Sequence, residues 1–238
     1  MNEHFHWFGT GHVIALLVIG FAILCLYVFR RSLRHPTANR ATRYALAAIL
    51  GLSQISLDAW FAFGGQWTLD YNLPLQLCMI ALLLSIWMLL TRNHTIFEFT
   101  FLAGMGGALQ AILTPDIGMY VFPHYRVMEF FIAHGAILAA CFFMVFVEGY
   151  RITLRSIWKS FLILNVCAAI AGIANWLTGG NYMFLAHKPV AASLLDFLGP
   201  WPWYIVSLEG VALVSYFVFY LPFLLVAWLE KKRGPVSK

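Results

Sequence analysis

Seven apolar stretches, each about 20 residues long, run through this chain of 238 residues and exclude an ordinary soluble fold. Hydrophobic residues make up 62% of the sequence and charged residues 11%, whereas soluble domains average about 45–50% and about 25%. Each stretch is long enough for a helix to cross the hydrocarbon core of a bilayer. The predicted helices are 12–29, 44–63, 72–90, 95–114, 127–147, 157–177 and 204–229. We expect an all-α fold, a polytopic membrane helix bundle with seven transmembrane helices in a single domain.

The Lys and Arg residues are unevenly divided between the two sides of this predicted bundle. All 15 except Arg126 and Lys188 fall on one side. Positive residues favour the cytoplasmic side, so the N-terminus is predicted outside and the C-terminus in the cytoplasm of a multi-pass cell-membrane protein. We interpret the net charge of +5 as a topology signal, and expect membrane lipids rather than nucleic acid as partners. The thirteen residues on the positive side are Arg30, Arg31, Arg34, Arg40, Arg43, Arg92, Arg151, Arg155, Lys159, Lys231, Lys232, Arg233 and Lys238.

The four cysteines, Cys25, Cys78, Cys141 and Cys167, lie inside the apolar stretches rather than in connections. Packing as a small hydrophobic residue is the default interpretation for each of them. The first eleven residues hold Glu3 and no Lys or Arg. A secretory leader begins with positive charge, so no cleavable leader is expected.

Polar residues inside the apolar stretches gather at one predicted depth, in the outer half of the bundle. The inner half is sparser, with Asn165 and Glu98 as its clear members. Polar groups in lipid are costly and usually mark a site or a pathway. The pattern predicts a polar cavity open to the outside and covered by the long connection 178–203, which we interpret as an ordered lid. The outer residues are His12, Asp58, Gln76, Cys78, Gln110, His134, Asn175 and Glu209.

Each of these residues has a structural interpretation beside the functional one. Asp58 and Glu209 are suited to orienting a histidine, carrying protons or binding a cationic head group, and equally to a structural pair with a buried donor. Gln110, Asn165 and Asn175 belong to a class that more often joins helices by hydrogen bonds.

The positions of the histidines in the sequence do not favour a metal site or a haem site. A bis-histidine haem needs two axial ligands that face each other, and His12 and His134 are the two histidines of the outer layer. No ligand spacing typical of a metal site joins them to the acidic residues. We therefore expect neither a metal ion nor a cofactor.

Four segments carry a more specific signal. They are LPLQLC (73–78), GMGGALQAILTPD (104–116), FFIAHG (130–135) and an outer connection with NYMFLAHKP (181–189) and LGPWPWY (198–204). In this order they resemble the PLHLC, GGALQ…TPD, FFxxHG and outer-loop motifs of the YwaF/TMEM164 family of integral membrane proteins. Asp116, Asn181 and Lys188 lie in these motifs and join the candidate substrate-binding or supporting residues.

The resemblance implies an activity, because the animal member of the family is regarded as a phospholipid acyltransferase. The cysteine and histidine proposed for its catalysis correspond to Cys78 and His134, which implies acyl transfer through a cysteine thioester. Gln76 stands where the motif has a histidine. Glutamine forms hydrogen bonds but does not shuttle protons, so the chemistry of this chain differs from the motif or is lost.

Two classes of function stay open. One is a lipid acyltransferase or acyl hydrolase that uses Cys78 and His134. The other is a non-enzymatic transporter or small-ligand-binding protein that uses a cavity between Asp58 and Glu209, with a seven-helix receptor as a third alternative. A transporter needs a polar route to both faces, and the apolar inner half favours a closed cavity.

Overall fold

The computed structural model describes residues 5–189 and 194–232, and the regular elements of these residues are helices. The predicted all-α fold is therefore confirmed. Glu3, Arg233, Lys238 and residues 190–193 of the predicted lid lie outside the described residues. The helices are α1 (Thr10–Val28), α2 (Arg30–Leu33), α3 (Pro36–Phe63), α4 (Leu77–Thr91), α5 (His94–Phe99), the π-helical η1 (Thr100–Gly104), α6 (Met105–Leu113), α7 (Tyr125–Phe146), α8 (Leu154–Thr178), the 3₁₀ turns η2 (Tyr182–Phe184) and η3 (Leu194–Leu198), and α9 (Trp203–Lys232).

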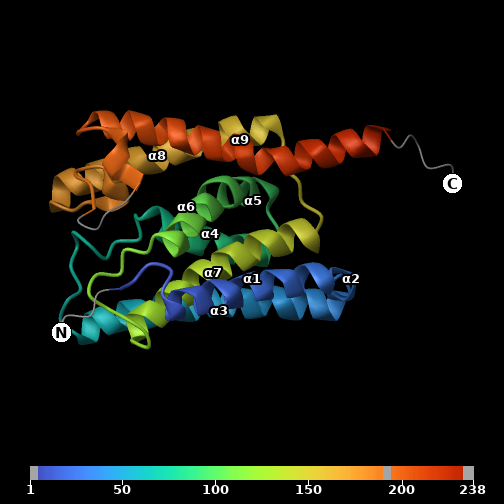
Figure 1. Cartoon of the computed structure of the whole chain (residues 1–238), viewed down its shortest axis with the longest axis horizontal. Coiled ribbons are helices and arrows are strands. Elements are labelled where there is room, and N and C mark those ends of the chain that lie inside the picture. Colours follow the sequence, from blue (N-terminus) through green and yellow to red (C-terminus); the bar gives the residue numbers. More distant parts are fainter. Residues whose placement is uncertain (1–4, 190–193, 233–238) are drawn as a thin grey trace.

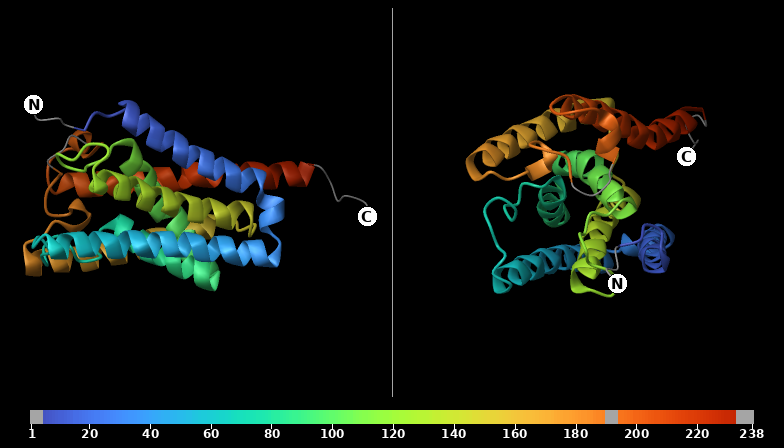
Figure 2. Two further views of the ribbon diagram at one scale, coloured as in Figure 1. Left: turned by 90° about the horizontal axis from the view of Figure 1, so that it is seen from below. Right: turned by 60° about the vertical axis from the view of Figure 1, so that its left-hand side comes forward.

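The long helices form an elongated bundle in layers (Figure 1). Helices α8 and α9 lie along one side, α1 and α3 lie along the opposite side, and α4 to α7 lie between them (Figure 2). Helix α7 packs against α1, α3, α4 and α6, so it is the central helix of the bundle. Its central position explains why most of its residues are buried.

Burial differs sharply between the central and the outer helices. We compared the most apolar 18 residues of each segment. In α7, 67% of these residues are buried, and in the run His94–Leu113, 61% are. In α1 and in α9, only 6% are buried. Apolar side chains on α1 and α9 therefore face outward, where only a bilayer would cover such a surface. Six helices in the described residues are long and apolar enough to cross a membrane.

Helices α3 and α4 begin five or more residues from their predicted starts, and the other long helices begin within three residues of theirs. Helix α3 begins at Pro36 rather than at residue 44, because proline suits the first helical position and the following basic turns continue the helix. Helix α4 begins at Leu77 rather than at residue 72, after a loop that holds Pro74. With 15 residues α4 is about 22 Å long, and the prediction of seven full-length spans is not confirmed for this helix.

Glycine residues let the run from α5 to α6 approach its neighbours closely, as expected for a membrane bundle. A Cβ added to Gly104 would lie 2.7 Å from Cβ of Ala81 in α4. A Cβ on Gly106 would lie 3.2 Å from Phe219 in α9. At the π-helical segment between α5 and α6, the carbonyl of Thr100 accepts a hydrogen bond from the N–H of Met105 and a second one from the Cys141 thiol at 3.6 Å.

The two ends of the bundle differ in character. We call the end with residues 64–76, 114–124 and 179–189 the loop end, and the end with residues 29–35, 92–93 and 147–153 the arginine end. Helix α1 begins at the loop end and α9 ends at the arginine end (Figure 1). The uneven distribution of Lys and Arg in the sequence thus corresponds to a difference in charge between the two ends of the folded bundle.

Candidate functional site

Cys78 is the second residue of α4, in its first turn at the loop end. The N-cap residue Gln76 has no side-chain bond to this turn, because its Oε1 atom accepts a hydrogen bond from the backbone N–H of Met183 instead, at 2.9 Å. The N–H groups of Leu77, Cys78 and Met79 consequently have no hydrogen-bond partner among the described residues. Free donors at a helix N-terminus stabilise negative charge, on a thiolate or on an oxyanion.

A glycine of α6 faces the Cys78 thiol. A Cβ added to Gly107 would lie 3.8 Å from Sγ of Cys78 and 3.3 Å from the side chain of Leu77. Cys78 itself is only partly buried. The thiol therefore faces α6 at Gly107, where a larger side chain would contact it.

His134 lies on α7 with one ring nitrogen fixed. Its Nδ1–H donates to the carbonyl of Phe130 at 2.7 Å, and the Phe130 ring packs on the imidazole with centroids 4.1 Å apart. A carbonyl only accepts, so the neutral ring carries its proton on Nδ1. Nε2 is then an unprotonated acceptor, with no hydrogen-bond partner in the part of the chain that the structure describes. This is the tautomer that a general base requires.

Cys78 and His134 lie at a similar level in the bundle. Arg92 and Glu148 join the arginine ends of α4 and α7 through an ion pair of 3.9 Å. Cys78 precedes Arg92 by 14 residues, and His134 precedes Glu148 by the same number. Because a helix rises about 1.5 Å per residue, both residues are about 21 Å above that pair. Helices α4 and α7 pack against each other, yet no hydrogen bond between Cys78 and His134 occurs in these described helices.

A folded segment covers the loop end next to α4. The hydroxyl of Tyr182 donates to the carbonyl of Leu69 at 2.7 Å and accepts from the N–H of Leu73 at 3.0 Å. Burial raises the pKa of this hydroxyl, so it stays protonated as the donor. Asn175 of α8 holds the same residue from the other side, through the N–H of Tyr182 at 2.6 Å and its carbonyl at 3.0 Å. We call residues 179–189 the cover segment.

The cover segment also has internal order. The Oδ1 atom of Asn181 accepts hydrogen bonds from the N–H groups of Ala186 and His187 at 3.0 and 3.1 Å. The Lys188 ammonium lies 5.6 Å from the ring centroid of Tyr204 in α9, and the Tyr204 hydroxyl donates to the carbonyl of Phe184. Asn181 and Lys188 thus shape the cover in this structure.

The family assignment rests on a match over most of the chain. A protein-family model described as the TMEM164 family matches residues 7–220. The chain belongs to the TMEM164 family. Comparisons with curated proteins and with solved structures give no match. The expected resemblance is confirmed, and the chain is a membrane protein of this family with several apolar helices.

The other acidic and amide candidates of this TMEM164-family protein lie apart from one another. Asp58 accepts from the amide of Gln54 one turn earlier on α3, at 3.1 Å. Glu209 of α9 accepts from the amide of Asn165 on α8 at 3.0 Å. Helices α3 and α9 lie in opposite outer layers (Figure 1). The structure does not bring Asp58 and Glu209 to one cavity.

Three further candidates, two from the outer layer and Asp116 from the motif segments, contribute differently. Gln110 and Asp116 are exposed at the loop end, and their side chains have no hydrogen-bond partner among the described residues. His12 is 1% exposed, and both its ring nitrogens are used: Nδ1 accepts from the N–H of Phe8 and Nε2–H donates to the carbonyl of Ile112. His12 therefore joins α1 to α6. Groups of three or more His, Cys, Asp or Glu side chains suited to a metal ion do not occur in the described residues.

A buried ion pair at the loop end of α7 was not among the sequence candidates. Nη1 of Arg126 donates to Oε2 of Glu129 at 2.6 Å, and Ser53 of α3 donates to Oε1 at 3.4 Å. Glu129 is 5% exposed. The spacing of three residues between Arg126 and Glu129 is the sequence signal that could have revealed the pair. The pair fixes α7 against α3 one to two turns above His134.

Proposed function

We propose that this TMEM164-family protein transfers acyl groups between membrane phospholipids, with Cys78 as the nucleophile and His134 as the general acid and base. The observation that carries the proposal is the free first turn of α4 around Cys78, at the level of an imidazole whose Nε2 is available. A nucleophile, a base in the correct tautomer and a set of oxyanion donors are the parts that acyl transfer needs.

In the first half-reaction, Nε2 of His134 takes the proton of the Cys78 thiol, and the thiolate attacks the carbonyl carbon of a phospholipid ester. The negative oxygen of the tetrahedral intermediate faces the free N–H groups of the first turn of α4. The carbon–oxygen ester bond then breaks, the imidazolium returns its proton to the leaving alkoxide, and a lysophospholipid departs. The acyl group remains on Cys78 as a thioester.

In the second half-reaction, the hydroxyl of another lysophospholipid attacks the thioester while Nε2 of His134 accepts its proton. The carbon–sulfur bond breaks, and the Cys78 thiolate recovers the proton from the imidazolium. Water in place of the lysophospholipid would give hydrolysis. The cover segment over the loop end supports transfer rather than hydrolysis, since exclusion of water protects a reactive intermediate.

The same proposal includes an orientation in the cell membrane, with seven crossings, the loop end outside and the arginine end in the cytoplasm. The concentration of arginine at one end of the folded bundle supports it. In this orientation α4 is a seventh, shorter crossing in addition to the six long helices. The loop 64–76 and the cover segment span the remaining distance from the start of α4 to the outer surface. Phospholipid esters lie just beneath the head groups, which places Cys78 near them.

The test is acyl exchange in liposomes that contain the purified protein, a labelled diacyl phospholipid and an unlabelled lysophospholipid. We expect exchange by the wild type and by Cys25→Ala. This variant is the matched control, because Cys25 is a cysteine of α1 far from the loop end of α4. Cys78→Ala and His134→Gln should abolish it while thermal unfolding stays normal. Exchange that survives Cys78→Ala would discard the nucleophile. No exchange by folded wild type with several lipid classes would favour a binding or transport role.

A further inference from the structure

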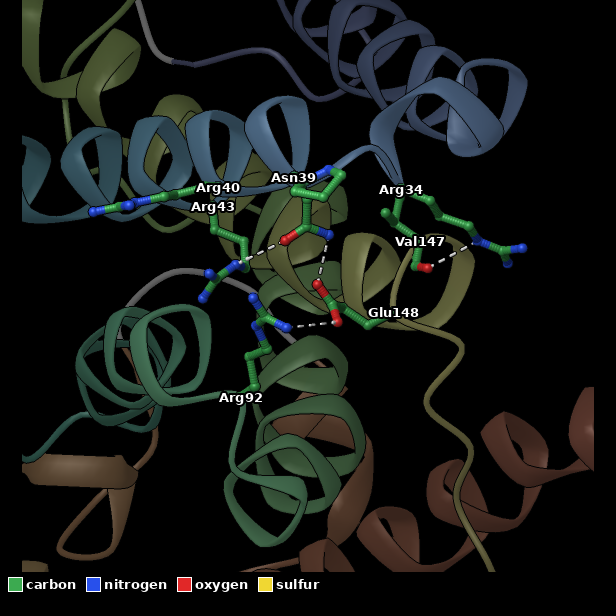
Figure 3. Close-up of a pocket in the computed structure, with 8 residues that line it drawn as sticks. Arg34, Asn39, Arg40, Arg43, Arg92, Val147 and Glu148 are labelled. Carbon is green, nitrogen blue, oxygen red and sulfur yellow. Dashed lines mark hydrogen bonds and ion pairs between the residues drawn. The ribbon is translucent and has the colours of Figure 1, made fainter.

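A cavity of about 400 Å³ lies at the arginine end, opposite the candidate acyl-transfer site. It is bounded by the C-terminal end of α2, the first turns of α3, the turn between α4 and α5, and the end of α7 (Figure 3). Its lining residues are Arg34, Pro36, Asn39, Arg40, Arg43, Arg92, Val147 and Glu148. Four guanidinium groups therefore surround it, and among these lining residues Glu148 alone carries a carboxylate.

The most unusual member of this set is Arg43, which is 5% exposed. Its Nε–H donates to Oδ1 of Asn39 at 3.1 Å, and Nη1 donates to the carbonyl of Leu89. No ion pair joins Arg43 to a carboxylate within residues 5–189 and 194–232. Buried charges are normally paired with an opposite charge, because an unpaired charge is costly to bury. The Arg43 guanidinium has no such anionic partner among the described residues.

Glu148 makes no direct hydrogen bond or ion pair with Arg43 in the part of the chain that the structure describes. Its Oε1 atom accepts from the amide of Asn39 at 2.7 Å, and its Oε2 atom lies 3.9 Å from Nη1 of Arg92, beyond hydrogen-bond distance. Figure 3 shows the guanidinium groups of Arg43 and Arg92 approaching each other from α3 and from the α4–α5 turn, with Glu148 to one side. Two like charges that approach in this way are stabilised by an anion between them.

The backbone adds to the positive potential. Helix α3 begins at Pro36 without a side-chain cap, and the N–H groups of Thr37 and Ala38 have no partner among the described residues. A second cavity of about 400 Å³ is lined by Pro36, Thr37, Arg40, Ala41 and Tyr44. The two cavities share Pro36 and Arg40, so the positive region extends along the first turns of α3.

We propose that this arginine cavity binds a phosphate group. Guanidinium groups form paired hydrogen bonds with phosphate oxygens, and the N-terminus of a helix favours the same anion. The proposal does not rest on acyl transfer, because the cavity lies about 21 Å from the level of Cys78.

A lipid headgroup and a soluble phosphate are the two sources of such a group. The second cavity is lined by Arg40 and Tyr44, and Leu52 and Ile55 farther along α3 lie toward the same side of the helix and are exposed and apolar. A surface of this kind accommodates acyl chains beside a bound headgroup. The geometry thus favours an anionic phospholipid with its headgroup in the cavity and its chains along α3.

Calorimetric titration of the purified full-length protein in neutral detergent tests the proposal with three probes. They are dioctanoyl phosphatidic acid, dioctanoylglycerol, which has the same chains without phosphate, and inorganic phosphate. We expect phosphatidic acid to bind, more weakly as salt increases, and dioctanoylglycerol not to bind. Binding of inorganic phosphate with equal affinity would identify the soluble anion as the source. Absence of binding by both phosphate probes, or equal binding of both lipids, would overturn the proposal.

Variants locate the site. Arg92→Gln removes an exposed guanidinium that lines the cavity, and we expect about tenfold weaker binding of phosphatidic acid. Arg43→Lys keeps the charge but loses the planar pair of donors, with a similar loss expected. The control is Arg31→Gln, an exposed arginine of α2 outside the cavity, which should leave the affinity unchanged. An equal loss in Arg31→Gln and Arg92→Gln would show unspecific attraction and overturn the site.

Discussion

The side chain of Gln76 bonds to the backbone N–H of Met183 at 2.9 Å, although Gln76 is the N-cap residue of α4. A residue at this position usually satisfies the first turn of its own helix. Here it holds the cover segment instead and leaves the donors around Cys78 free. The position where the family motif has a histidine thus has a role in this structure that needs no proton transfer.

Replacing Gln76 with serine tests this arrangement. Serine is a preferred N-cap residue, so we expect it to bond to the free N–H of Met79 and to release Met183. Acyl exchange should fall strongly, because one of the proposed oxyanion donors is lost and the cover is loosened. The unfolding temperature should change little, since a gained cap offsets a lost hydrogen bond, each worth about 1 kcal/mol. Exchange at the wild-type rate in Gln76→Ser would contradict an oxyanion role for this turn.

Asn175 should matter more for stability than the other asparagine of α8. Asn175→Ala removes the partner of both the buried N–H and the carbonyl of Tyr182. We expect a loss of about 2–4 kcal/mol in the free energy of unfolding, together with faster proteolysis of the cover segment. Asn165→Ala removes a single side-chain hydrogen bond between helices, to Glu209, and should cost less than about 1 kcal/mol. Equal losses in denaturant titrations would show that Asn175 does not hold the cover.

The pair of Arg126 and Glu129 should behave as a buried ion pair. Glu129→Leu leaves the Arg126 guanidinium, whose side chain is 12% exposed, without its carboxylate. We expect destabilisation by about 3–5 kcal/mol. The double variant Arg126→Leu/Glu129→Leu removes both charges, and its stability should return close to that of the wild type. Thermal unfolding of the two variants side by side gives the comparison, and a double variant no better than the single one would contradict it.

Much of the fold could be predicted from hydrophobicity, because an apolar run of about 20 residues has one stable form in lipid. The start of α3 was missed because residues 36–43 are polar on the whole, and only packing against α4 and α7 buries Arg43 among them. The start of α4 was placed too early because residues 72–76 are apolar enough to extend the run. In the structure Asn72 closes a turn with the N–H of Thr68, and Pro74 follows it.

The candidate site could be predicted only in part, for a similar reason. Depth along a helix follows from counting residues, so Cys78 and His134 could be placed in one layer. Which side chains face each other depends on helix packing, and this separates Asp58 from Glu209. It also engages both nitrogens of His12 while leaving Nε2 of His134 free. No periodicity in the sequence distinguishes these two histidines.

The close approach of α4 to the π-helical segment beside α6 makes a prediction about glycine. Gly104→Ala would place a Cβ 2.7 Å from Cβ of Ala81, closer than such atoms lie in proteins. Because both atoms belong to packed helices, the helices must move apart, and we expect a loss of about 1–3 kcal/mol in the free energy of unfolding. Acyl exchange should fall as well, since α4 carries Cys78 only three residues before Ala81.

A second substitution distinguishes this steric clash from a general destabilising effect of alanine in place of glycine in the bundle. Ala81→Gly in the Gly104→Ala background reopens the space and should restore most of the lost stability and exchange. Gly20→Ala in α1 is the matched control, because a Cβ there meets no atom within 4 Å. Alanine is the better helix former, so this change should stabilise the protein by up to about 1 kcal/mol. Thermal unfolding of the three variants decides, and failure of Ala81→Gly to rescue Gly104→Ala would mean that contact with α4 is not what requires the glycine.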